Sequence, residues 1–166
     1  MKMLQRPSPN YNARPCPVDC VVLHATADSD TEGSIAWCQT PKSRNPNPVS
    51  YHVIVDRDGT IYHLVDTAKR AWHAGVSEFE GRKNCNDYSI GLSFANRNDG
   101  VEPYTEEQYE AAATLISAWM SRYPLVTPER ITTHAIVARP VGRKTDPIAF
   151  DVPRLVAMLD QPQRAA

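Results

Sequence analysis

An Asp-Gly pair separates two β-rich runs in the segment from Val49 to Leu64, which reads VSYHVIVDRDGTIYHL. Asp-Gly between alternating apolar residues is the strongest short-range signal for a β-hairpin, because the turn needs residues that accept a positive φ. Side chains alternate between the two faces of a strand, so the pattern predicts Tyr51, Val53 and Val55 on one face, opposite His52. The chain is therefore expected to build a sheet that contains this hairpin.

Further strands and helices are predicted on both sides of the hairpin. Apolar runs predict buried strands at 20–23 and 89–95, and a third short strand that starts at Ile131 and leads to His134. Helices are predicted over 34–39, 105–123 and 152–159, the longest of them with Thr105 and Gln108 as a capping box. This order predicts one α/β domain with a central mixed sheet and helices on both of its faces.

The size and charge of the chain fit a single globular domain. Its 166 residues carry 18 Lys and Arg against 19 Asp and Glu, so the near-neutral charge does not favour a nucleic-acid partner. Apolar runs are too short to span a bilayer, and the N-terminus lacks the apolar core of a signal peptide. We expect a monomer, made in the cytoplasm, with an extended arm over residues 1–17 and a catalytic domain over residues 18–160.

Two further details concern small residues. The four cysteines Cys16, Cys20, Cys38 and Cys85 are compatible with two disulfides, but a cytoplasm disfavours them, and buried reduced thiols are the favoured interpretation. Gly91, inside the predicted strand 89–95, indicates a bulge or a place where another part of the chain comes close.

Three metal-ligand residues stand at points where chemistry is expected. His24 follows the first apolar strand, while His134 and Asp146 belong to one segment, RITTHAIVARPVGRKTDPIAFD, which also carries Lys144. Two His and one Asp form a three-ligand zinc set that leaves a position for water, as in catalytic sites. Taken alone, His24 fits a core histidine as well, and sequence spacing does not show that the three residues meet.

Five motifs in order resemble the zinc-dependent N-acetylmuramoyl-L-alanine amidases of type 2, a family that shares its fold with the peptidoglycan-recognition proteins. The motifs are VVLHAT, SYHVIVDRDGTIYHLVD, AWHAG, YSIGLSFAN and THAIVARPVGRKTDP, and together they cover most of the chain. The resemblance implies one Zn2+ per chain, held by His24, His134 and Asp146. It also implies hydrolysis of the amide between the lactyl group of N-acetylmuramic acid and L-alanine, so that the partner is peptidoglycan.

The same resemblance implies roles for four more residues. Lys144 matches the catalytic lysine of the family, and Tyr51 matches a tyrosine of its small phage enzymes. His73 matches a position that lines the substrate groove, and we assign it to substrate binding together with Trp72. The recycling branch of the family carries a glutamate where this chain has Ser93, which favours the phage-like branch.

Three functions therefore remain in competition. The leading hypothesis is a phage endolysin that degrades intact cell wall after release by a holin. The first alternative is a cytosolic amidase that recycles soluble anhydro-muropeptides. The second is a module that binds peptidoglycan without cleaving it, which is disfavoured because the zinc ligands and Lys144 are all present.

Overall fold

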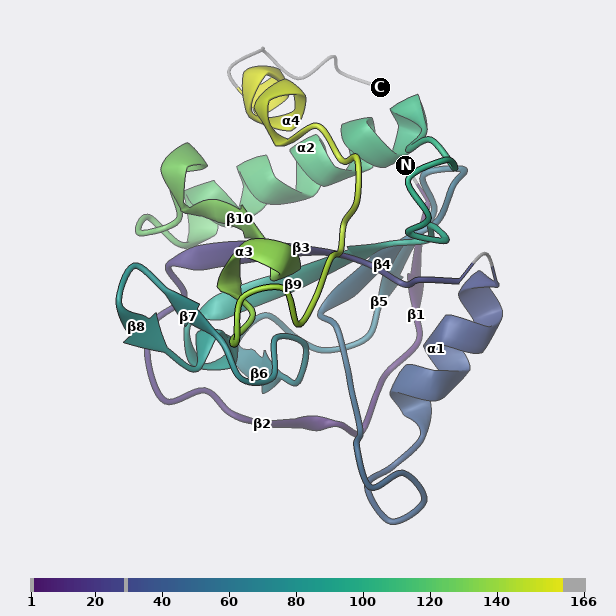
Figure 1. The fold of residues 1–166 in the computed structure, drawn as a ribbon, viewed down its shortest axis with the longest axis vertical. Coiled ribbons are helices and arrows are strands. Elements are labelled where there is room, and N and C mark those ends of the chain that lie inside the picture. Colours follow the sequence, from purple (N-terminus) through teal and green to yellow (C-terminus); the bar gives the residue numbers. More distant parts are fainter. Residues whose placement is uncertain (1, 29, 160–166) are drawn as a thin grey trace.

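A computed structural model describes residues 2–28 and 30–159 of the chain and shows a central sheet with helices on both faces (Figure 1). Among these residues, the sheet has six strands in the order β1-β5-β4-β9-β3-β10. Only the β4–β5 pair is antiparallel, so the sheet is mixed, as predicted. The strands are β1 (Met3–Gln5), β3 (Cys20–Ala25), β4 (Val53–Val55), β5 (Ile61–His63), β9 (Ser89–Phe94) and β10 (Ile131–Thr133).

The two faces of the sheet carry different helices (Figure 1). Helices α2 (Glu106–Arg122) and α4 (Val152–Leu159) cover one face, and their apolar side chains pack on residues such as Leu23 and Leu92. Helix α1 (Thr31–Gln39) packs on the other face, where Ile35 meets Ile54. Because side chains alternate along β3, His24 lies on the α1 face, opposite Leu23.

Short elements complete the chain around this sheet. Strand β2 (Tyr11–Ala13) pairs with β6 (Lys69–Ala71), and β7 (Glu78–Phe79) pairs with β8 (Arg82–Lys83). The remaining helical turns are η1 (Cys85–Asp87), η2 (Pro128–Arg130) and α3 (His134–Val137). No helix in the described part of the chain is long and apolar enough to cross a membrane.

Several predictions from the sequence are confirmed. The hairpin forms, with Val53 opposite His63, and the Thr105–Gln108 capping box is present at the start of α2. Helix α4 covers the predicted residues, and the four cysteines are free thiols. A Cβ on Gly91 would stand 2.5 Å from the ring of His73, so this glycine does mark a close approach.

Other predictions need correction. Tyr51 packs with Ile54 and not with Val53 and Val55, because the chain bends at His52 and the regular strand starts only at Val53. The segment 78–87, for which no element was predicted, contains the β7–β8 hairpin and η1; both strands of the hairpin are too short to show an apolar period.

The predicted N-terminal arm is built into the fold. Met3–Gln5 forms an edge strand of the central sheet, and Tyr11–Ala13 pairs with β6. The division into an arm and a domain starting at residue 18 stays a prediction, and its end at residue 160 lies outside the described residues.

His52 is fully buried and is held in its neutral form. Its Nδ1 accepts a hydrogen bond from the backbone N–H of Gly91 at 2.9 Å, so the ring proton belongs on Nε2, which faces the carbonyl of Lys69 at 3.1 Å. Burial, with the nearby charge of Arg14, lowers the pKa of His52 to about 3. A protonated ring would turn a second N–H toward the N–H of Gly91.

This burial predicts a pH dependence of stability. As the pH falls below about 6.5, the unfolded chain binds a proton at His52 that the native chain does not, so stability is lost at up to about 1.4 kcal/mol per pH unit until about pH 3. In His52→Gln this loss is absent. Urea unfolding of the metal-free protein between pH 6 and pH 4 should therefore show a shallower slope for the variant, and equal slopes would contradict the assignment.

Candidate metal centre

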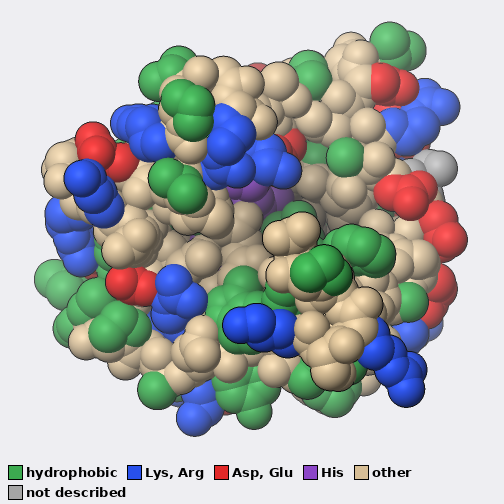
Figure 2. Space-filling view, turned by 60° about the horizontal axis from the view of Figure 1, so that its bottom comes forward, with side chains coloured by type: hydrophobic (Ala, Val, Ile, Leu, Met, Phe, Trp, Pro, Cys, Tyr) green, Lys and Arg blue, Asp and Glu red, His purple; other side chains and the backbone are tan. Residues whose placement is uncertain are grey.

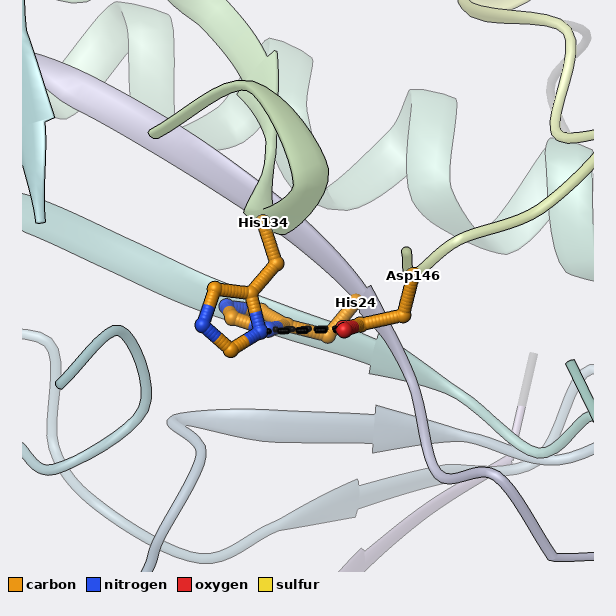
Figure 3. Close-up of side chains that lie close together, drawn as sticks. All are labelled: His24, His134 and Asp146. Atoms are coloured by element: carbon orange, nitrogen blue, oxygen red, sulfur yellow. Dashed lines mark hydrogen bonds and ion pairs between the residues drawn. The ribbon is translucent and has the colours of Figure 1, made fainter. Parts of the chain in front are cut away.

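Three separate segments bring His24, His134 and Asp146 together (Figure 3). β3 and β10 are adjacent parallel strands, so their carboxyl ends meet at one edge of the sheet. His24 lies near the end of β3, and His134 begins α3 directly after β10. Asp146 comes from the following loop, where its carbonyl accepts a hydrogen bond from the N–H of Ala135 at 2.9 Å.

The potential ligand atoms of the three residues lie within 4.8 Å of one another. The Asp146 carboxylate stands 3.3 Å from Nδ1 of His24 and 3.1 Å from Nδ1 of His134. All three residues are buried, with exposures of 0%, 5% and 8% for His24, His134 and Asp146. The three residues that the family resemblance groups together therefore lie side by side, which sequence spacing alone did not show.

The protonation of the two imidazoles follows from their outer partners. Nε2 of His134 lies 3.2 Å from the carbonyl of Ala74, and its Nδ1 lies 3.1 Å from Oδ2 of Asp146, so both ring nitrogens face acceptors. Nε2 of His24 lies 2.9 Å from Nδ1 of His73, and the inner Nδ1 of His24 has no hydrogen-bond partner. A cation held between the two inner nitrogens and the carboxylate would leave each ring proton on Nε2, where an outer partner faces it.

The charge states of the site agree with this arrangement. Burial lowers the pKa of His24 to about 4, against the pull of the adjacent Asp146 carboxylate, so the ring is neutral at neutral pH. Burial acts to raise the pKa of Asp146, but the adjacent imidazoles of His134 and His24 outweigh it and hold that pKa well below its usual value. Burial also lowers the pKa of His73, so the Asp146 carboxylate and the neutral rings of His24 and His73 lie together at the centre.

A groove of about 890 Å³ opens over this centre. Figure 2 shows histidine atoms at the bottom of a hollow with Lys and Arg atoms near its rim. The basic residues that line the groove are Lys42, Arg70, Arg143 and Lys144, and Asp146 is the acidic residue among the lining. A substrate that carries carboxylates therefore meets a favourable field there.

The other predicted site residues also line the groove, with different degrees of access. Lys144 is exposed, and its charge helps to lower the pKa of His24. Tyr51 is half-buried, its ring centre is 5.1 Å from that of His24, and burial raises its pKa, so the phenol keeps its proton. Trp72 is half-buried and donates through Nε1 to Asn12. His73 is only 5% exposed.

Sequence reasoning missed some polar groups of the site. Asn86 accepts hydrogen bonds from the N–H groups of His73 and Ala74, and Arg143 donates to the carbonyls of Ala74 and Val76. Asn86 lies in a segment for which the sequence predicted no strand or helix, and nothing in its neighbours points to this contact. Arg143 was visible only as part of a basic run.

The comparison with protein families decides what this centre belongs to. Residues 14–149 match the family model described as N-acetylmuramoyl-L-alanine amidase. The chain belongs to this family. The resemblance in the five motifs is thereby confirmed, and so are the predicted fold and the assignment as an amide hydrolase.

Relatives of this amidase agree with the family model. It is 34% identical to the 1,6-anhydro-N-acetylmuramyl-L-alanine amidase AmpD of Salmonella typhimurium, over 92% of this chain and 88% of the relative. A crystal structure of a selenomethionine AmpD derivative superimposes with a TM-score of 0.77 at 31% identity, over 95% of this chain and 93% of the other.

A second solved structure contains a ligand. It is the Escherichia coli amidase AmiD in complex with the substrate anhydro-N-acetylmuramic acid-L-Ala-D-gamma-Glu-L-Lys. It superimposes with a TM-score of 0.73 at 31% identity, and the match covers 85% of this chain and 57% of that one.

Removal of the carboxylate should abolish metal binding. In Asp146→Asn the amide is a weaker donor and carries no charge, so we expect affinity for a divalent transition metal to fall by more than about 100-fold, beyond the cost typical of an outer-sphere change. Metal content after dialysis and competition with a chromophoric chelator measure this.

A control variant shows whether the loss is specific to the Asp146 carboxylate or follows from removing any carboxylate. Asp66→Asn changes an exposed carboxylate whose contact is the N–H of Ala68, and it should leave metal binding unchanged. Wild-type affinity in Asp146→Asn would remove Asp146 from the site.

Proposed function

We propose that this amidase is zinc-dependent and hydrolyses the lactyl–L-alanine amide of soluble 1,6-anhydro-muropeptides. The observation that carries the proposal is the buried His24–His134–Asp146 centre at the bottom of a basic groove in a chain of this family. The relatives named for the anhydro substrate support the soluble substrate, since the similarity to AmpD covers most of both chains. The sequence alone had favoured intact cell wall.

Two imidazoles and a carboxylate are a donor set typical of catalytic zinc sites. When bound, zinc supplies a Lewis acid and activates water for attack on an amide carbonyl. The three residues would hold the ion, and their burial keeps competing water away from it. The groove side of the centre is where the substrate amide would lie.

Two groove residues, Lys144 and Tyr51, are our candidates for stabilising the charge that develops on the amide oxygen. Lys144 is a cation two residues from Asp146 at the groove, and Tyr51 keeps its phenolic proton because burial raises its pKa. A protonated phenol donates a hydrogen bond and does not serve as a base. We therefore assign both residues to oxyanion stabilisation, with Trp72 as a groove wall for the muramyl group.

The charge of the groove supports a muropeptide as substrate. Four basic side chains line it, and a stem peptide carries free carboxylates along its length. Lys42 and Lys144 are both exposed, so their ammonium groups are available to such carboxylates. This attraction speeds the encounter with an anionic substrate and weakens in high salt.

The endolysin hypothesis keeps one observation in its favour. Ser93 stands beside His24 on the neighbouring strand, so the site has no carboxylate there. The similarity to AmpD favours the recycling alternative, and with it a cytoplasmic place of action. Release by a holin and a monomeric state stay predictions.

Lys144→Gln should separate catalysis from metal binding. Loss of the cation should lower kcat by about 10²- to 10³-fold, the usual cost of one oxyanion donor. Zinc content should stay at the wild-type level because Lys144 is not a ligand. The matched control Lys42→Gln removes the other exposed lysine of the groove and should affect KM more than kcat.

Two results would contradict the catalytic role of Lys144. Wild-type kcat in Lys144→Gln, with zinc bound, would reduce this lysine to a surface charge. An equal fall of kcat in both variants would show that the groove charge, and not Lys144 itself, matters for turnover.

The substrate preference is tested by offering the lactyl–alanine amide in a soluble muropeptide and in intact cell wall. Zinc-loaded protein should cleave a soluble anhydro-muropeptide at the lactyl–alanine amide, as read by mass spectrometry, and should act at least about tenfold more slowly on intact sacculi. A chelator should stop both reactions. Faster cleavage of sacculi would return the endolysin hypothesis to first place, and binding without cleavage would favour a recognition module.

A further inference from the structure

Two residues of the segment Trp72–Gly75, which also contributes to the groove lining, contact the candidate imidazole ligands. The side chain of His73 meets Nε2 of His24 at 2.9 Å, and the carbonyl of the next residue, Ala74, meets Nε2 of His134 at 3.2 Å. Two consecutive residues thus provide the outer partner of both candidate imidazole ligands. His73 and Ala74 are 5% and 0% exposed, so these contacts are shielded from water.

We propose that His73 is a positioning residue that fixes the proton of His24 on Nε2 and so presents Nδ1 to the metal. This inference rests on the proposed zinc site. It replaces the assignment of His73 to substrate binding. Outer partners of this kind orient metal-binding imidazoles and raise their basicity.

The hydrogen bonds that link Cys85, Ser89, His73 and His24 have a direction, which can be assigned by starting at the carbonyl of Cys85. The carbonyl of Cys85 can only accept, so the hydroxyl of Ser89 donates to it. The Ser89 oxygen, 3.4 Å from Nε2 of His73, is then free to accept from that nitrogen. With one proton on the His73 ring, its Nδ1 accepts from Nε2 of His24. The chain of donors therefore runs from His24 through His73 and Ser89 to a backbone carbonyl.

Two features hold His73 in this position. Asn86, which is 6% exposed, accepts through Oδ1 from the N–H of His73 at 3.1 Å and of Ala74 at 2.8 Å. Gly91 on β9 leaves the space for the ring, because a Cβ there would stand 2.5 to 2.8 Å from three of its atoms. The ring therefore has one place to lie, between the sheet and His24.

The proposal is tested by zinc affinity, measured by chelator competition on folded protein. His73→Ala removes the acceptor and should weaken zinc binding by about 10- to 100-fold. His73→Asn places an amide oxygen near the position of Nδ1 and should recover most of that loss. His63→Ala is the control: it removes a histidine of β5, whose Nδ1 meets Oε1 of Gln5 at 3.0 Å and which β4 and β9 separate from His24 on β3, and it should leave zinc affinity unchanged.

The outcomes separate this inference from the proposed function. If the wild type does not bind zinc, the proposed metal site itself fails. If the wild type binds zinc and His73→Ala binds it equally well, the positioning role is overturned. Equal affinities of the His73→Ala and His73→Asn variants, or an equal loss in His63→Ala, overturn it as well, since the effect would then be a general loosening of the fold.

A second readout needs neither metal nor activity. Histidine ¹⁵N spectra of the metal-free wild type should show His24 with its proton on Nε2. The His73→Ala variant should show a mixture of the two tautomers. A proton on Nδ1 of His24 in the wild type would overturn the proposal.

Discussion

The close approach of one buried carboxylate to two buried imidazoles is the constraint on which the rest of this structure depends. The Asp146 carboxylate lies 3.1 to 3.3 Å from the inner nitrogens of two imidazoles, and all three side chains are buried. Without a cation or an added proton at their centre, such an arrangement costs free energy, because buried polar groups need partners. The two parallel strands, the short helix α3 and the loop that carries Asp146 are arranged so that this cluster forms at one edge of the sheet.

The surrounding structure supports that cluster from two directions. Helices α2 and α4 and the apolar face of the sheet form a core that keeps β3 and β9 rigid. On the other face, small and polar residues of β9 leave room for the Trp72–Gly75 segment, which contacts both imidazoles. The groove then lies over the cluster with a basic lining. A rigid scaffold with a positioned outer shell is what metal-centred catalysis requires.

Much of this could be predicted from the sequence, for reasons that differ between residues. The hairpin and α2 were predicted correctly because each has a local signal in the sequence. These signals are an Asp-Gly turn and a capping box. The candidate ligands were singled out because His and Asp are ligand residue types and the motifs resemble a known family. The side of Tyr51 was missed, since a bend at His52 is set by tertiary contacts. Asn86 was missed because its role depends on backbone groups of a distant segment. The choice between soluble and intact substrate was not fixed by the ligands, which both branches share.

The central claim is that His24, His134 and Asp146 bind one zinc ion through inner atoms chosen by their outer partners. Diffraction from crystals of the zinc-loaded protein, recorded on both sides of the zinc absorption edge, tests it directly. The account predicts one anomalous peak at about 2.0 to 2.2 Å from Nδ1 of His24, Nδ1 of His134 and a carboxylate oxygen of Asp146. A peak bound through Nε2 of either histidine, or one away from Asp146, would contradict it.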